Sequence, residues 1–182
     1  KKLSVNYHNS EGIRLVMNRD EILDVLPGSD KKKIYGIAFD LGTTSAVGYL
    51  YDMEDSTMVG VSSTLNKQTE LGGDVITRIN CVIEDTGNQA RLQKLAADTL
   101  NKIIDDICSF HQISTDDIYL SAVCGNSTMQ HLFLGLYPEY LGMLPFSSTI
   151  HMGFETDARE LGLKINPMGK TAFLPLLGGF VG

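Results

Sequence analysis

One stretch of the sequence decides the fold: Ile34-Tyr35-Gly36-Ile37-Ala38-Phe39-Asp40-Leu41-Gly42-Thr43-Thr44-Ser45. Residues 34 to 39 are nearly all apolar, which is typical of a strand that is covered on both faces in the middle of a sheet. The residues after Phe39 are short, polar or glycine, which favours a tight turn. We therefore expect a buried strand that delivers a polar turn to one edge of a sheet.

The expected turn has the residue types of a phosphate cradle. Gly42 can adopt a backbone conformation barred to other residues, and the amides that follow it can point at one anion. Thr43 and Thr44 add hydroxyl donors. Gly42, Thr43, Thr44 and Ser45 are therefore candidate cofactor-binding residues. Asp40 is the candidate catalytic and metal-binding residue, because Mg²⁺ prefers oxygen ligands and keeps part of its water shell. An ordinary hairpin turn that uses Gly and Thr for geometry alone is the alternative.

The segments around this stretch predict a mixed α/β sheet. Residues 46–51 and 58–64 are strand candidates joined by a polar linker, so with 34–39 they predict an antiparallel meander. Residues 13–17 and 22–26 predict a separate hairpin that turns at 18–20. Apolar residues recur at three- and four-residue steps from 89 to 111, which indicates an amphipathic helix packed on the sheet, with Thr86 or Asn88 as its cap.

The second half of the chain continues with strands and crossover helices. Residues 118–124 predict an interior strand and 128–136 a helix that stops near Pro138. Residues 142–170 have no clear period, and we expect a loop there with one short helix at 155–161. Residues 172–177 are the last strand candidate. Antiparallel strands followed by crossover helices predict an α/β fold with a mixed sheet.

A second polar constellation, Gly125-Asn126-Ser127-Thr128, follows the strand at 118–124 and begins a helix. Ligands of open α/β sheets gather at the carboxyl ends of strands, and helix starts offer free amides, so Gly125, Asn126 and Thr128 are candidate cofactor-binding residues. A simple helix cap by Asn126 or Ser127 is the alternative. Asp74, which follows Gly72-Gly73, is a further candidate, with a capped helix and an Asp74 to Arg78 pair as the alternative.

Composition excludes several classes of function. Fifteen Lys and Arg against 22 Asp and Glu give a net charge of −7, which argues against nucleic acid or an anionic membrane surface as a partner. No run approaches the roughly 20 apolar residues that span a bilayer, so we expect a cytoplasmic protein. Three distant cysteines and four scattered histidines show no spacing for an iron-sulfur cluster or zinc site. The chain ends suggest a fragment of a longer protein.

Four blocks together resemble the reductive activators of corrinoid proteins, a branch of the superfamily that also holds acetate and sugar kinases, heat-shock chaperones and actin. The blocks are residues 35–44, Gly72-Gly73-Asp74-Val75-Ile76-Thr77-Arg78-Ile79, Cys124-Gly125-Asn126-Ser127-Thr128-Met129 with Leu134-Gly135-Leu136, and Leu174-Pro175-Leu176-Leu177-Gly178-Gly179-Phe180-Val181-Gly182. The resemblance implies that residues 31–182 form the ribonuclease H-like first lobe of an actin-like ATPase, and that residues 1–30 end a linker domain.

The resemblance also implies a function. ATP and Mg²⁺ would lie between this lobe and a second lobe outside the chain, with Asp40 to Thr44 as the first phosphate turn. ATP hydrolysis would help drive one-electron reduction of the cobalt in a corrinoid methyl-transfer protein, the partner. The electron would come from an iron-sulfur cluster in a domain that the chain lacks. A kinase of small alcohols or acids and a non-catalytic docking lobe are the alternatives, and a homodimer is possible through the exposed inter-lobe face.

Overall fold

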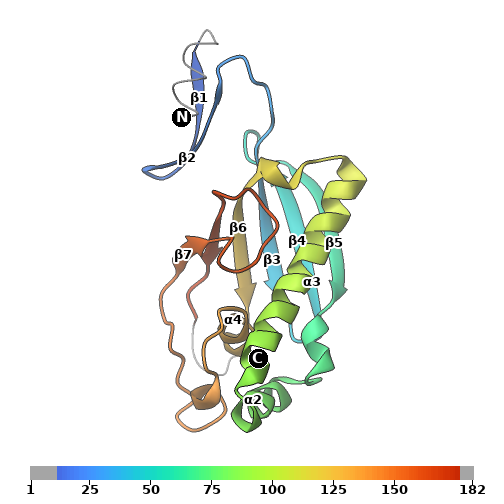
Figure 1. Ribbon diagram of the computed structural model, residues 1–182, viewed down its shortest axis with the longest axis vertical. Coiled ribbons are helices and arrows are strands. Elements are labelled where there is room, and N and C mark those ends of the chain that lie inside the picture. Colours follow the sequence, from blue (N-terminus) through green and yellow to red (C-terminus); the bar gives the residue numbers. More distant parts are fainter. Residues whose placement is uncertain (1–11, 177–182) are drawn as a thin grey trace.

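The computed structural model describes residues 12–176, which form a six-stranded sheet crossed by one long helix, and a separate two-stranded hairpin (Figure 1). The strands are β1 (Ile13–Asn18), β2 (Glu21–Pro27), β3 (Tyr35–Leu41), β4 (Ser45–Asp52), β5 (Met58–Leu65), β6 (Ile118–Gly125), β7 (Phe154–Asp157) and β8 (Lys170–Phe173). The helices are α2 (Val75–Glu84), α3 (Gly87–His111) and α4 (Ser127–Phe133), with short 3₁₀ turns η1 (Lys67–Glu70), η2 (Thr115–Asp117) and η3 (Glu139–Leu141).

The sheet is mixed, as the sequence predicts. Its order is β5-β4-β3-β6-β8-β7. Strands β3, β4 and β5 form the expected antiparallel meander. Strand β6 pairs in parallel with β3 and with β8, and β7 is the edge strand, which pairs with β8 in the antiparallel direction. The chain reaches β6 through α2 and α3, which is the crossover that a parallel pairing requires. The α/β class with a mixed sheet is therefore confirmed.

The core lies between α3 and one face of the sheet. The inward stripe of α3 includes the fully buried Leu92, Leu100 and Ile103, which pack with Phe39 of β3 in one cluster. Burying one such side chain stabilises the fold by roughly 1.5–3 kcal/mol. A Cβ atom on Gly48 would lie 2.5 Å from Cγ2 of Ile103, so a glycine allows α3 to approach β4 this closely. The periodic pattern at 89–111 therefore predicts the helix correctly.

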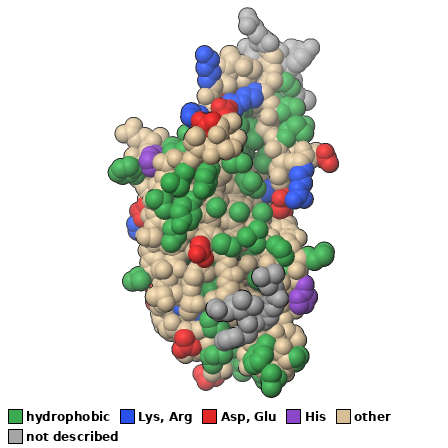
Figure 2. Space-filling model, turned by 180° about the vertical axis from the view of Figure 1, so that it is seen from behind, with side chains coloured by type: hydrophobic (Ala, Val, Ile, Leu, Met, Phe, Trp, Pro, Cys, Tyr) green, Lys and Arg blue, Asp and Glu red, His purple; other side chains and the backbone are tan. Residues whose placement is uncertain are grey.

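The opposite face of the sheet is partly open, which differs from the expectation that residues 34–39 are covered on both faces. Within residues 12–176, Ala38 is half-buried and Asp40 is exposed, while the alternating residues of β3 face the core. On this open face, Ala38 pairs with Tyr49 of β4, and Tyr49 pairs with Val61 of β5. Tyr49 and Val61 are 38% and 55% exposed. Figure 2 shows hydrophobic side chains gathered on the face seen from behind. Glycine and alanine make β3 look apolar, although residues 12–176 leave part of this face uncovered.

Three local predictions are wrong or shifted. Residues 154–157 form strand β7 instead of the start of a helix, because they pair with β8 and Phe154 stacks on Phe173 at 5.0 Å. Thr86 precedes α3 but makes no side-chain cap, and the Asn88 amide donates to the Cys81 carbonyl instead. Helix α4 ends at Phe133, earlier than expected.

The last predicted strand also begins and ends earlier, at 170–173, and the motif from residue 177 onward lies outside the described residues.

The β1–β2 hairpin contacts the main sheet through a small cluster. Val16 and Leu23 pack with Tyr119 of β6, and the Tyr119 hydroxyl donates to Asp24 Oδ2 at 2.9 Å. Burial and this carboxylate raise the pKa of Tyr119, so the phenol stays protonated. The hairpin and its turn at 18–20 are confirmed, while the assignment of residues 1–30 to a linker domain stays a prediction.

Candidate functional site

The two polar constellations meet at one edge of the sheet. The parallel register of β3 and β6 pairs Leu41 with Gly125, so both strands deliver their turns to the same place. The side-chain amide of Asn126 donates to Thr43 Oγ1 at 3.1 Å, across 83 residues of sequence. The structure therefore brings Asp40, the 42–45 turn and Gly125-Asn126 together, as the sequence predicts for the carboxyl ends of parallel strands.

Glycine is required at two places in this site, for a reason other than the one expected. Gly42 does not adopt a positive φ, so the predicted special backbone conformation is wrong. A Cβ atom on Gly42 would lie 2.6 Å from the carbonyl oxygen of Ser45, and one on Gly125 would lie 2.7 Å from that of Leu41. Both glycines are therefore needed because backbone passes close to them. This close approach lets the two turns sit against each other.

The carbonyl groups of the turn are held from inside the protein. The side-chain amide of Asn66 donates to the Gly42 carbonyl at 2.8 Å, and Arg78 Nη2 donates to the Thr43 carbonyl at 2.6 Å. The backbone N–H of Asn66 donates to the Thr44 carbonyl at 2.9 Å. Three consecutive carbonyl groups thus point inward to protein donors. Neither Asn66 nor this role of Arg78 is signalled by the sequence motif.

Arg78 is fully buried and forms no ion pair with Asp74, which corrects the expected i, i+4 pair, although the Asp74 carboxylate still attracts it from a longer distance. Its guanidinium turns inward and donates to the Gly72 carbonyl at 2.9 Å and to Gln68 Oε1 at 3.2 Å. No carboxylate within residues 12–176 lies within ion-pair distance of it. Burial lowers the pKa of Arg78, although an arginine side chain remains charged at any ordinary pH.

Asp74 caps the start of α2. Its carboxylate accepts from the backbone N–H of Thr77 at 2.8 Å and from the Thr77 hydroxyl at 2.7 Å, and these hydrogen bonds lower its pKa. The capping alternative is confirmed. In the part of the chain that the structure describes, Asp74 makes no hydrogen bond to the 42–45 turn, so its candidate role toward a ligand stays a prediction.

Asn126 also acts as a helix cap, since its Oδ1 accepts from the N–H of Met129 at 2.9 Å while its Nδ2 contacts Thr43. Gly125 and Asn126 are half-buried and accessible to a ligand. Ser127 and Thr128 are only 5% and 3% exposed, so Thr128 offers little surface for ligand binding. The surface of this constellation is therefore formed by Asn126 and not by Thr128.

Asp40 lies on the open face of the sheet, beside Cys124 on β6. Burial and, to a smaller extent, the negative charge of Asp40 raise the pKa of Cys124, so this thiol stays protonated. Among the described residues, no group of three or more His, Cys, Asp or Glu side chains is placed to hold a metal ion. A cation at Asp40 would therefore take its remaining ligands from water and from a bound phosphate.

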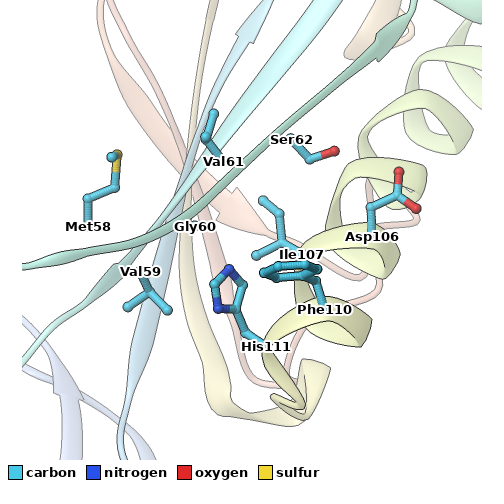
Figure 3. Close-up of a pocket in the computed structure, with 9 residues that line it drawn as sticks. All are labelled: Met58, Val59, Gly60, Val61, Ser62, Asp106, Ile107, Phe110 and His111. Carbon is cyan, nitrogen blue, oxygen red and sulfur yellow. The ribbon is translucent and has the colours of Figure 1, made fainter.

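A separate hollow of about 520 Å³ lies at the other end of the sheet (Figure 3). It lies between β5 and the end of α3, with Met58, Val61 and Phe110 among its lining residues. Met58 pairs with Tyr51 near the end of β4, whereas the polar turn precedes Ser45 at the start of β4. This hollow is therefore remote from the 42–45 turn.

Fold and site together define an α/β protein whose mixed sheet presents a glycine-containing polar turn beside a helix start. A solved structure titled "Reductive activator for corrinoid,iron-sulfur protein" superimposes with a TM-score of 0.84 at 32% identity, over 88% of this chain and 26% of that one. Residues 35–182 match the family described as the RACo middle region. The chain therefore belongs to the corrinoid reductive activator family, in its RACo middle region.

A curated relative supports the same assignment. The corrinoid activation enzyme RamQ of Eubacterium limosum is 44% identical over 173 residues, which are 94% of this chain and 29% of that protein. The chain thus spans less than a third of the length of either relative. No helix within residues 12–176 has the length and hydrophobicity to cross a membrane.

Proposed function

We propose that residues 31–182 form the first, ribonuclease H-like lobe of an actin-like ATPase domain within a corrinoid reductive activator. In the longer protein, ATP hydrolysis drives the transfer of one electron from an iron-sulfur cluster, held in another domain, to the cobalt of a corrinoid methyl-transfer protein. The cobalt passes from the divalent to the monovalent state. Membership in the activator family and the names of the two relatives support this proposal.

The observation that carries the proposal is the 42–45 turn with its inward-held carbonyl groups. Within residues 12–176, no protein acceptor receives the backbone N–H of Thr43 or Thr44. Two adjacent N–H groups of this kind form an anion-binding concavity. The Thr44 side chain is exposed and the Thr43 side chain half-buried, so their hydroxyl groups contribute further donors to a phosphate.

Asp40 supplies the negative charge for Mg²⁺. It is exposed beside the turn, and its backbone continues directly into the phosphate-binding residues. Mg²⁺ binds through one or two carboxylates together with waters and substrate phosphates, which matches a site with one carboxylate and a phosphate cradle. Asp40 therefore holds the cation through its water shell while Thr43 and Thr44 hold the phosphates.

ATP affects electron transfer through closure of two lobes. A ligand shifts a conformational equilibrium only by its difference in affinity for the two conformations. Phosphates held by this lobe and by a second lobe favour the closed form, and hydrolysis releases that preference. Half of such a nucleotide site lies in this chain, so the 182-residue chain alone binds Mg-ATP weakly, with a Kd above about 10 μM.

The test uses the longer polypeptide that contains this chain and its Asp40→Ala variant. We expect slow ATP hydrolysis by the parent protein and its loss in the variant, with an unchanged melting temperature because Asp40 is exposed. Release of inorganic phosphate, without transfer to acetate or a sugar, separates the activator from a kinase. Equal turnover by parent and variant would refute the assignment.

A further inference from the structure

We infer that Asn66 and Arg78 are positioning residues that hold the 42–45 turn in its phosphate-binding form, with the buried charge of Arg78 adding to the attraction for the anion. This inference rests on the proposed function only in naming the anion as a phosphate chain. Neither residue touches the ligand. Both act through the peptide groups of the turn.

The peptide geometry carries the first step. The C=O of one residue and the N–H of the next lie in one plane and point in opposite directions across a trans peptide. Asn66 fixes the Gly42 carbonyl inward, so the N–H of Thr43 points away from the buried side. Arg78 fixes the Thr43 carbonyl inward, so the N–H of Thr44 does the same. Two consecutive donors are thus oriented before any ligand arrives.

The anchors are themselves fixed to the core. Gln68 Oε1 accepts from both Asn66 Nδ2 and Arg78 Nη1, each at 3.2 Å. The Gln68 side-chain amide in turn donates to the Leu92 carbonyl of α3 at 2.9 Å. All three anchoring side chains are fully buried, so their rotamers are locked by packing. Donors that are held in place before binding lose less entropy when the ligand arrives, which strengthens binding.

The charge of Arg78 gives the second step. A buried charge that makes no ion pair is unfavourable, and the buried guanidinium of Arg78 forms none within residues 12–176, although it is attracted from a longer distance by Asp74. The guanidinium lies on the carbonyl side of the Thr43–Thr44 peptide group, and the Thr44 N–H lies on the opposite side. An anion bound there lies on the far side of this peptide group, so the peptide dipole and the guanidinium attract it from the same direction. A bound phosphate adds a second negative charge to that of Asp74, on the side of the turn where the N–H groups point.

The experiment titrates the 182-residue chain with inorganic tripolyphosphate and follows the backbone ¹H–¹⁵N signals of Thr43 and Thr44. The variants are Arg78→Met, which removes the charge, Arg78→Lys, which keeps it, and Asn66→Asp, which replaces the donor to Gly42 with a carboxylate near Arg78. Ile79→Val is the matched control, because Ile79 is buried next to Arg78 on α2 and has no part in the anchoring network.

We expect saturating shifts of both signals in the parent and in Ile79→Val. Arg78→Met and Asn66→Asp should bind tripolyphosphate at least about tenfold more weakly, with Arg78→Lys in between, since one ammonium cannot hold the Thr43 and Gly72 carbonyls together. Melting temperatures measured alongside identify variants that fold. A structural role alone would change melting temperature without changing the affinity of folded variants.

Two results would overturn the inference: no shift at Thr43 and Thr44 in the parent, or equal affinity in the parent and the folded Arg78 and Asn66 variants. Failure of the proposed function is visible separately. If the longer polypeptide does not hydrolyse ATP while the tripolyphosphate results hold, the anchored anion site stands and the ATPase assignment falls.

Discussion

Asn126 joins the two polar turns at this edge of the sheet, because its Nδ2 donates to Thr43 Oγ1 at 3.1 Å while its Oδ1 caps α4 through the N–H of Met129. One side chain thus caps the start of a helix and holds the Thr43 hydroxyl group of the candidate phosphate turn. The two roles use different atoms of the same amide. A substitution that changes only one atom can therefore separate them.

Asn126→Asp should keep the cap and replace the amide donor beside Thr43 with a carboxylate oxygen, which can only accept a hydrogen bond from the Thr43 hydroxyl. The carboxylate still accepts from Met129, so we expect little change in melting temperature, whereas the missing donor and the added negative charge weaken Mg-ATP binding by the longer protein. Asn126→Ala removes both contacts and should also cost about 1 kcal/mol of stability through the cap. Calorimetric titration and thermal melting measure the two effects. Unaltered nucleotide affinity in Asn126→Asp would contradict this division of roles.

Gly125→Ala should destabilise the fold by about 1–3 kcal/mol, because the added Cβ would lie 2.7 Å from the Leu41 carbonyl oxygen and force two paired strands apart. Gly73→Ala is the control, since nothing lies within 4 Å of its added Cβ. Urea unfolding of the two variants gives the comparison. Similar stability for both would mean that the close approach of the two turns is not required.

Stability should decrease below neutral pH because of His131. This side chain is fully buried, donates from Nδ1 to the Ser127 carbonyl at 2.8 Å and accepts at Nε2 from the N–H of Thr149 at 3.1 Å. Burial lowers its pKa, so the unfolded chain binds the proton more readily than the folded one. The free energy of unfolding therefore falls as the pH drops below about 6.5, the ordinary histidine value.

Comparison with His131→Gln isolates this effect. The difference in free energy of unfolding between parent and variant should shrink as the pH is lowered from about 7.5 to about 5.5, since only the parent has the buried histidine. Chemical denaturation at a series of pH values measures it. A difference that stays constant with pH would show that His131 does not remain neutral in the folded protein.

Tyr119→Phe should loosen the hairpin from the main sheet. The substitution removes the hydroxyl that donates to the buried Asp24 and leaves that carboxylate with one hydrogen bond fewer, which costs about 1–3 kcal/mol. Amide exchange of β1 and β2 should accelerate, whereas exchange in β3 and β6 should follow global stability. Uniform acceleration across the chain would instead mean that the hairpin and the sheet unfold together.

The parts of the fold that follow from sequence are those with local signals. The apolar run before Asp40, the three- and four-residue steps of α3 and the helix start at Asn126 each depend on residues close in sequence, and the structure contains all three elements. The meeting of the two turns was also predictable, because parallel strands end at the same edge of a sheet.

The anchoring residues were not predictable in this way. Asn66 and Arg78 lie 24 and 35 residues from the carbonyl groups that they hold, so only tertiary packing places them there. The four-residue spacing alone assigns Arg78 to an ion pair with Asp74, since spacing within a helix contains no information about burial. Strand β7 was missed for the same reason, because its strand conformation depends on pairing with β8.

The parallel pairing of β3 with β6 has a consequence for biosynthesis. The chain between these strands holds the meander, α2 and α3, and contacts between distant segments form late because their loops are costly to close. During translation, the residues of the first turn leave the ribosome long before Asn126 does. A growing chain that ends before Asn126 therefore carries the 42–45 turn without the side chain that contacts Thr43.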